Sequence, residues 1–137
     1  MKAVFADTLY WVAISRPKDS WRAAALQARR NIGEAVLVTT DEVLSEFLTA
    51  MAKGGPWMRV TAVRVVRAIL VDPGVSVLPQ SREGFVNGLA LFENRPDKSY
   101  SLTDCISMNV MRAEGIQEIL TNDSHFTQEG LHVLIKR

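Results

Sequence analysis

Short runs of apolar residues alternate with longer amphipathic segments along the chain. The runs have the length and composition of buried strands and fall at residues 2–6, 35–39, 75–78, 117–121 and 131–135. Between them apolar residues recur at helical spacing, near residues 9–14, 19–32, 40–53, 57–70, 82–93 and 102–114. Continuous apolar strands that alternate with helices are typical of a mainly parallel sheet covered on both faces. The pattern therefore predicts an α/β fold with about five strands.

Turn and cap signals separate these segments without dividing the chain. Gly54-Gly55-Pro56 ends one predicted helix and opens the next, and Asp72-Pro73-Gly74 predicts a turn before the third strand. Residues 94–101 predict a polar loop. No repeat or linker interrupts the 137 residues, so we expect one domain spanning 1–137.

Composition indicates an ordinary globular protein. The chain is 47% apolar and 23% charged, with a net charge of +1, so bulk charge alone does not identify a nucleic-acid-binding protein. The single cysteine, Cys105, lies in a helical pattern and is expected to be a small core residue. That single cysteine fits a reducing cytoplasm. Lys2 and Asp7 flank the first apolar run, so we expect no signal peptide, and no uncharged stretch approaches the roughly 18 residues that a membrane span needs.

Four separated acids fall where a predicted strand ends or a helix begins: Asp7, Glu46, Asp104 and Asp123. Parallel sheets gather their ligand sites at the carboxyl ends of the strands, so these side chains could converge. At a spacing of roughly 5 Å each pair of charges repels by about 3 kcal/mol. Such a cluster must take up protons or hold a cation, and an all-oxygen set favours Mg²⁺ or Mn²⁺. The first hypothesis is metal-assisted chemistry on a phosphate.

Each acid also has a purely structural interpretation. Asp7 could cap the helix that follows it, Ser101 and Asp104 could form a capping pair, and Asp123 could simply begin a turn. His125 invites a role as general base, although an exposed loop position is the expected one. Taken singly, the acids leave both interpretations open.

Glu46 has no such local function. We expect Thr39 to be the N-cap of its helix, with Glu42 reaching back as the third helical residue and Asp41 favoured by the helix dipole. Glu46 lies at the edge of the buried stripe, where a carboxylate needs a partner. On the helix of residues 102–114, Asn109 falls within the apolar stripe and should be buried and hydrogen-bonded.

Read in order, the segments around the four acids resemble the PIN-domain pattern, as found in VapC-type toxin ribonucleases. The matching segments are VFADT at 4–8, TTDEVLSE at 39–46, YSLTDCIS at 100–107 and LTNDSHF at 120–126. The last of these resembles the closing T-x-D-x-x-F of the family. Glu46 is assigned by its place in the helix, and Glu42 is the residue with which it could be confused.

The resemblance implies a three-layer α/β/α sandwich and a Mg²⁺- or Mn²⁺-dependent endoribonuclease. Asp7 and Asp104 would be direct metal ligands, and Glu46 and Asp123 would complete the site directly or through water. Thr8 and Thr121 would supply supporting hydrogen bonds. The metal would activate a water molecule for in-line attack, leaving a 5′-phosphate and a 3′-hydroxyl. An RNA substrate and an antitoxin partner are further implications.

Other functions fit less well. A receiver domain would need paired acids after the first strand and a late lysine, and a dinucleotide-binding domain would need a glycine-rich turn there, which Asp7-Thr8-Leu9 is not. Two alternatives stay open: a stand-alone PIN-fold RNA-processing nuclease, and a catalytically weak PIN-fold module that binds RNA or protein.

The segment Trp57–Val71 is apolar around most of its helical circumference, broken by little besides Arg59, Thr61, Arg64 and Arg67. One sheet face is too small to bury all of its apolar side chains. We therefore expect a homodimer, and a partner protein that docks on these helices; a deeper core is the alternative.

Overall fold

The computed structural model describes all residues, 1–137, and contains one five-stranded sheet in the order β3-β2-β1-β4-β5. The strands, which all pair in parallel, are β1 (Lys2–Ala6), β2 (Ala35–Thr40), β3 (Val75–Leu78), β4 (Glu118–Leu120) and β5 (His132–Val133). The helices are α1 (Thr8–Ser15), α2 (Arg22–Ile32), α3 (Asp41–Ala52), α4 (Pro56–Val71), α5 (Arg82–Glu93), α6 (Leu102–Glu114) and α7 (His125–Gln128). The predicted α/β/α fold with a five-stranded parallel sheet is confirmed.

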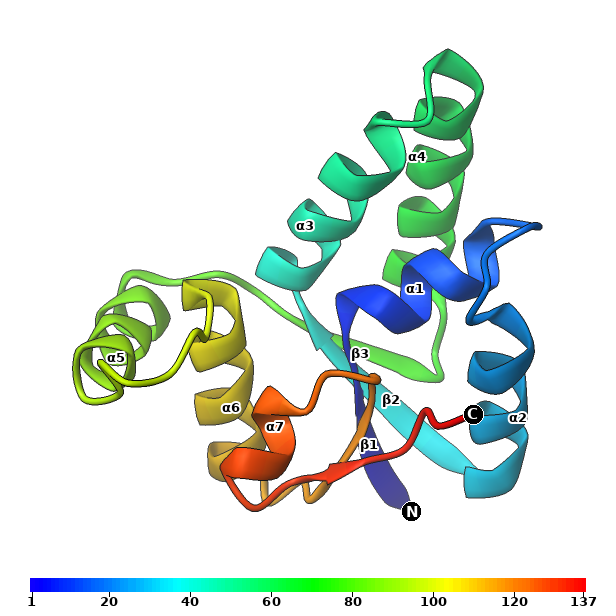
Figure 1. Ribbon diagram of the computed structural model, residues 1–137. Helices are drawn as coiled ribbons and strands as arrows, with labels where there is room; N and C mark the ends of the chain where they lie inside the picture. Colours follow the sequence, from blue (N-terminus) through cyan, green and yellow to red (C-terminus); the bar gives the residue numbers. More distant parts are fainter.

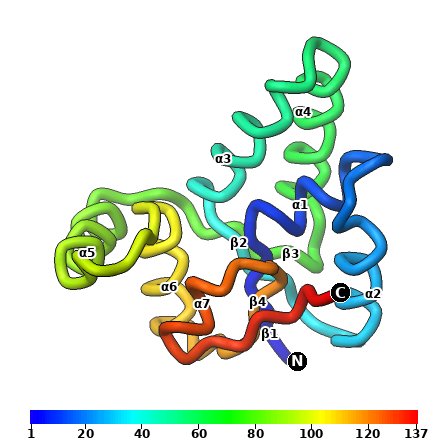
Figure 2. The backbone as a smooth tube through the Cα atoms, in the orientation of Figure 1, coloured from blue at the N-terminus to red at the C-terminus, as the bar shows by residue number.

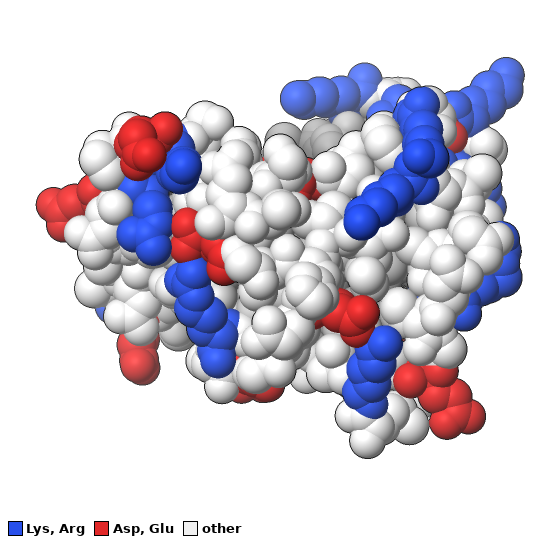
Figure 3. All heavy atoms as spheres, turned by 60° about the horizontal axis from the view of Figure 1, so that its bottom comes forward, with Lys and Arg blue, Asp and Glu red and all other residues white.

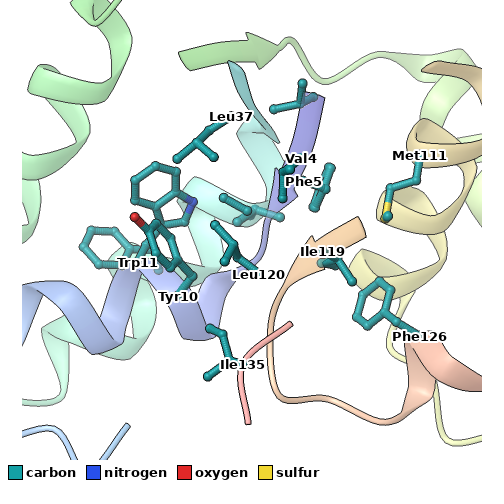
Figure 4. Close-up of a cluster of buried hydrophobic side chains, with 14 of the residues drawn as sticks. Val4, Phe5, Tyr10, Trp11, Leu37, Met111, Ile119, Leu120, Phe126 and Ile135 are labelled. Atoms are coloured by element: carbon teal, nitrogen blue, oxygen red, sulfur yellow. The ribbon is translucent and has the colours of Figure 1, made fainter. Parts of the chain in front are cut away.

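The central strand β1 is buried because it pairs on both edges and is covered on both faces. Val4 pairs with Leu37 of β2, and Phe5 pairs with Ile119 of β4. Val4, Phe5 and Ala6 are fully buried, which explains the continuous apolar run in place of alternation. Figure 4 shows Val4 and Phe5 between the aromatic side chains of α1 and the side chains of Met111 and Phe126.

The helices divide between the two faces of the sheet. The chain moves from β1 to β2 to β3 through α1–α4, then returns past β1 to β4 through α5 and α6. Because parallel crossovers are right-handed, this reversal of direction puts α5 and α6 on the opposite face. Figure 1 shows α6, with α5 outside it, on one side of the sheet and α1, α2 and α4 on the other. The strand order therefore reverses between β1 and β4, where α/β folds bind ligands.

Several predicted boundaries were wrong. The N-cap of α3 is Thr40, whose hydroxyl accepts a hydrogen bond from the Val43 N–H (3.1 Å), while Thr39 is buried and donates to the Ala6 carbonyl (2.9 Å). The strand thus continues one residue further than predicted, and Glu42 is not part of a capping box. Residues 19–21 form a turn before α2, and α7 was not predicted at all.

Asn109 is half-buried rather than buried; the fully buried polar residue of α6 is Ser107 instead. Helix α5 packs closely on α6, since an added Cβ at Gly88 would lie 2.6 Å from the Ile106 side chain. Cys105 is a buried free cysteine, as predicted. No helix has both the length and the apolar character that crossing a membrane requires.

Candidate active site

All four predicted acids line one pocket, although they come from four different parts of the chain. Asp7 follows β1, Glu46 lies in α3, Asp104 lies in the first turn of α6, and Asp123 precedes α7. The pocket, of about 560 Å³, lies at the carboxyl ends of β1 and β4. Figure 2 shows the turn after β4 beside the junction of β1 and α1, where the Asp7 N–H donates to the Leu120 carbonyl (3.2 Å).

Asp7 is buried at the centre of this group. It occupies the N-cap position of α1, but its side chain makes no capping hydrogen bond. Its Oδ2 instead accepts a hydrogen bond from the Thr121 hydroxyl (3.0 Å). Burial raises the pKa of Asp7 to about 7, with a further contribution from the charges of Asp104 and Glu46; hydrogen bonds, including that from Thr121, oppose the rise. Local helix capping therefore does not explain Asp7.

Glu46 reaches the same pocket from α3. Its side chain is exposed, and the Thr8 hydroxyl donates to its Oε1 at 2.5 Å. Thr8, which follows Asp7 in the chain, thus holds the carboxylate of Glu46 at the pocket. Glu42, with which Glu46 could be confused, lines a separate groove beside Arg82 and Phe85. The structure therefore distinguishes the two glutamates by position.

Asp104 combines the two roles that its sequence context suggests. Its Oδ2 accepts from the Ser101 N–H (3.1 Å) while its own N–H donates to the Ser101 hydroxyl (3.0 Å), which completes a capping box. Its Oδ1 makes no hydrogen bond within the protein. Burial and the nearby charge of Asp123 raise the pKa of Asp104, against the effect of the Ser101 N–H. One oxygen caps the helix, and the other is available to a ligand.

Asp123 lines the pocket at the start of the turn before α7, and His125 lies beside it. The Asp123 N–H donates to the Thr121 hydroxyl (3.2 Å), and Asp123 Oδ1 accepts from the His125 N–H (2.9 Å). The His125 ring lies with Nδ1 3.2 Å from Asp123 Oδ1 and 3.5 Å from Asp104 Oδ2. The expectation of an exposed loop histidine was therefore wrong: His125 begins α7 and is half-buried against two acids.

The comparison with protein families decides the fold family. The PIN domain model matches residues 4–129. The chain belongs to the PIN domain family. VapC20 of Mycobacterium tuberculosis, described as a sarcin-ricin loop cleaving toxin, has a similar structure, with a TM-score of 0.83 and 24% sequence identity over 93% of this chain and 95% of that one. At this identity the likeness concerns the fold. No curated protein sequence matches the chain.

The donor set of this PIN domain fits a hard divalent cation. Carboxylate oxygens of Asp104 and Asp123 and a ring nitrogen of His125 lie within 4.8 Å of one another; Asp7 and Glu46 line the same pocket but are not part of this group. No lysine or arginine lines the pocket. Burial and, to a smaller extent, the charges of Asp104 and Glu46 raise the pKa of Asp7, and no basic side chain of the pocket opposes that rise. A cation among these oxygens would remove the repulsion.

A second charged cluster, which sequence reasoning missed, supports the α7 side of the site. The Glu129 carboxylate accepts hydrogen bonds from Arg95 Nε (3.0 Å), Arg112 (2.6 Å) and the Tyr100 hydroxyl (2.8 Å). Its side chain is only 5% exposed, and its pKa is lowered to about 2, chiefly by the hydrogen bonds from Arg95. The Tyr100 ring packs edge-on against His125, with centroids 5.2 Å apart. The cluster thus fixes α7 and its histidine against α6.

Two further residues of the pocket, Asp19 and Trp21, were not predicted either. They lie in the turn that joins α1 to α2, which the sequence pattern assigned to a helix. The Asp-Ser-Trp sequence at 19–21 carries a polar turn signal, but nothing local indicates that the turn faces the acids.

Proposed function

We propose that this PIN domain is a Mg²⁺- or Mn²⁺-dependent endoribonuclease, and that it is the toxin of a type II toxin–antitoxin pair. The observation that carries the nuclease proposal is the convergence of Asp7, Glu46, Asp104 and Asp123 on one pocket without a neutralising lysine or arginine. The PIN family match and the VapC20-like fold support it.

In this proposal the buried Asp7 and the free Oδ1 of Asp104 bind the cation directly. Glu46 and Asp123 complete the site directly or through water. When bound, the divalent ion supplies an activated water nucleophile and neutralises charge that develops on the phosphate. Thr121 links Asp7 to the backbone of Asp123, and Thr8 holds Glu46, so both threonines fix the spacing of the carboxylates.

The side chains that surround the acids contribute positioning rather than covalent chemistry. Cys105 is buried and free, and burial raises the pKa of its thiol, which makes it a poor nucleophile. The proposed reaction is therefore direct hydrolysis with in-line attack by water. Its products would be a 5′-phosphate and a 3′-hydroxyl.

The proposed partners are a second copy of the chain and an antitoxin protein. Large apolar side chains are exposed on α4, where Trp57, Leu70 and Val71 are 68%, 56% and 81% exposed. A second exposed set on α5 comprises Phe85, Val86, Leu89 and Phe92. Apolar surface of this kind favours protein association, which supports the homodimer and the antitoxin.

The direct test is cleavage of a labelled RNA by the purified protein with Mn²⁺ or Mg²⁺, compared with EDTA and with a DNA strand of the same sequence. We expect metal-dependent internal cleavage of RNA and 5′-phosphate ends. Cyclic phosphate ends, or equal cleavage in EDTA, would identify another mechanism or a contaminant. Cell growth arrest that a co-expressed antitoxin relieves would separate the toxin from a stand-alone RNA-processing nuclease. A metal-binding protein without cleavage would favour the weak binding module.

A further inference from the structure

The two flanks of the acidic pocket differ in whether their basic side chains form ion pairs. On the α6–α7 flank, Arg95 and Arg112 are both bound to Glu129. On the opposite flank, four basic residues are exposed and take part in no ion pair: Arg16, Lys18, Lys136 and Arg137. In Figure 3 blue side chains gather toward the side where Figure 1 shows α2 and the end of the chain. Other basic residues, such as Arg59, Arg64 and Arg67 of α4, also take part in no ion pair, but these four belong to the loop between α1 and α2 or to the end of the chain, which contacts that loop.

An aromatic ring lies between this charge and the acids. Trp21 is half-buried and lines the pocket together with Asp7 and Glu46. The backbone N–H of Trp21 donates to the Asp19 carboxylate (2.8 Å), and this hydrogen bond fixes the turn that carries the indole. The position of Trp21 at the pocket wall is thus set by a local hydrogen bond.

A cation from the segment that follows β5 covers this ring. The Arg137 guanidinium lies 3.8 Å from the centroid of the Trp21 ring, and one of its nitrogens donates to the Ser20 hydroxyl (3.1 Å). Indole and guanidinium together form a flat, positively charged layer at the edge of the pocket. Such layers stack on the unpaired bases of single-stranded RNA.

RNA faces an electrostatic problem at this site, because a pocket lined by five acids repels phosphate. Attraction must come from cations near the pocket that are not already neutralised. Arg95 and Arg112 do not meet this condition, since Glu129 binds both. The basic residues around Trp21 do meet it.

We infer that the loop Arg16–Trp21, with Lys136 and Arg137, forms the RNA-binding side of the pocket. A base of single-stranded RNA beside the reacting phosphate stacks on the Trp21–Arg137 layer, and Arg16, Lys18 and Lys136 contact flanking phosphates. The inference rests on the proposed ribonuclease function. In this proposal the α1–α2 flank of the site holds the substrate.

The test measures RNA binding without cleavage. All variants are made in an Asp104→Asn background, and the fluorescence anisotropy of a short, unstructured, labelled RNA is followed in Mg²⁺. Trp21→Ala should weaken binding by about 5- to 150-fold, the factor for one stacked base, with the salt dependence unchanged. Trp21→Phe should restore most of the affinity. In a Trp57→Phe variant, RNA should quench the fluorescence of Trp21, since Trp11 is buried.

The charged residues give an independent readout that does not depend on the indole. Lys18→Gln and Lys136→Gln should each weaken binding and each reduce the slope of log K against log salt by about 0.7. Both side chains are exposed, so these variants should fold even if Trp21→Ala does not. Arg67→Gln, at an exposed position on α4, is the matched control and should change neither quantity.

Equal affinities and equal salt slopes in Lys18→Gln, Lys136→Gln and the Arg67→Gln control would overturn the inference. Absence of RNA binding by the folded protein at low salt would overturn it too. If instead the parent chain binds RNA through these residues but does not cleave it in Mn²⁺, the nuclease proposal fails and the binding surface stands.

Discussion

Acidic side chains near His125 occur in two different surroundings, and their pKa values shift in opposite directions. At Glu129, one acid is bound by two arginines and a tyrosine, and its pKa is lowered to about 2. In the pocket, five acids, Asp19 included, share no lysine or arginine, and burial raises the pKa of Asp7 to about 7. The first cluster stabilises the fold as it stands. The second is unfavourable until a proton or a cation joins it, which is the property expected of a ligand site.

The largest difference between the clusters should appear in catalysis. Asp7→Asn and Asp104→Asn should reduce metal-dependent RNA cleavage at least hundredfold, about 2.7 kcal/mol of transition-state stabilisation. Without metal their melting temperatures should equal or exceed that of the parent, because like-charge repulsion is relieved. Cleavage rates and thermal melts in EDTA measure both effects. If Asp104→Asn unfolds the metal-free protein and barely alters cleavage, Asp104 is only a helix cap.

The two clusters should also differ in how their contributions to the free energy of unfolding depend on pH. Asp7 has a folded-state pKa of about 7 against an ordinary value of 3.8, so the folded protein binds the extra proton between these limits. The free energy of unfolding of the metal-free protein should therefore fall by a few kcal/mol as pH rises from about 4 to 7. Denaturant titrations in EDTA would show this fall. Asp7→Asn should flatten it; an equally steep fall in that variant would mean that another group is responsible.

Glu129 should show the reverse. Its folded-state pKa of about 2 lies below the ordinary value of 4.5, so its contribution is fully present above pH 4.5 and is lost as pH falls toward 2. Glu129→Gln leaves the half-exposed Arg95 and Arg112 without their carboxylate and should cost about 2 kcal/mol of stability at pH 7. Chemical denaturation would measure it. A variant as stable as the parent at pH 7 would mean that the cluster does not hold α7 in place.

The smallest effect on the folded chain is expected on α4. Trp57→Glu and Val71→Glu place charge at exposed positions and should change monomer stability by less than about 0.5 kcal/mol, yet they should convert the proposed homodimer to monomers. Light scattering at micromolar concentration would measure the change. Phe85→Glu, on α5, is the matched variant on the other apolar surface. A parent chain that is already a monodisperse monomer would exclude the homodimer.

The fold was readable from the sequence because the strands are short, mainly apolar runs between periodic helices. This pattern predicted the positions of β1, β2 and β3 almost to the residue, although β3, at the edge of the sheet, is only partly buried. Helix α7 was not predicted because four residues are too few to show a period. The misplaced N-cap of α3 shows the limit of local rules, because Thr39 and Thr40 suit that position equally well. Thr39 is a buried strand residue that donates to the Ala6 carbonyl, so Thr40 is the N-cap.

The pocket was readable only in part. Asp7, Asp104 and Asp123 could be named because they follow strands or begin helices, and strand ends converge in a parallel sheet. Glu46 lies inside α3 and was assigned by its place at the edge of the buried stripe. The Glu129 cluster could not be predicted, because it joins residues up to 34 positions apart through side chains without a local pattern. His125 and Trp21 were missed for the same reason: their places depend on how a loop packs rather than on the residues beside them.

The most direct test of the central claim, that the acidic pocket is a divalent cation site, is Mn²⁺ binding measured by titration calorimetry in buffers of different ionisation enthalpy. Because Asp7 has a pKa of about 7, cation binding near pH 6 should release most of one proton per ion, and less at pH 8. Glu129→Gln should bind Mn²⁺ with the same stoichiometry, while Asp7→Asn should lose the proton release and most of the affinity. Undetectable Mn²⁺ binding by the parent chain, or binding that is unchanged in Asp7→Asn, would contradict the account.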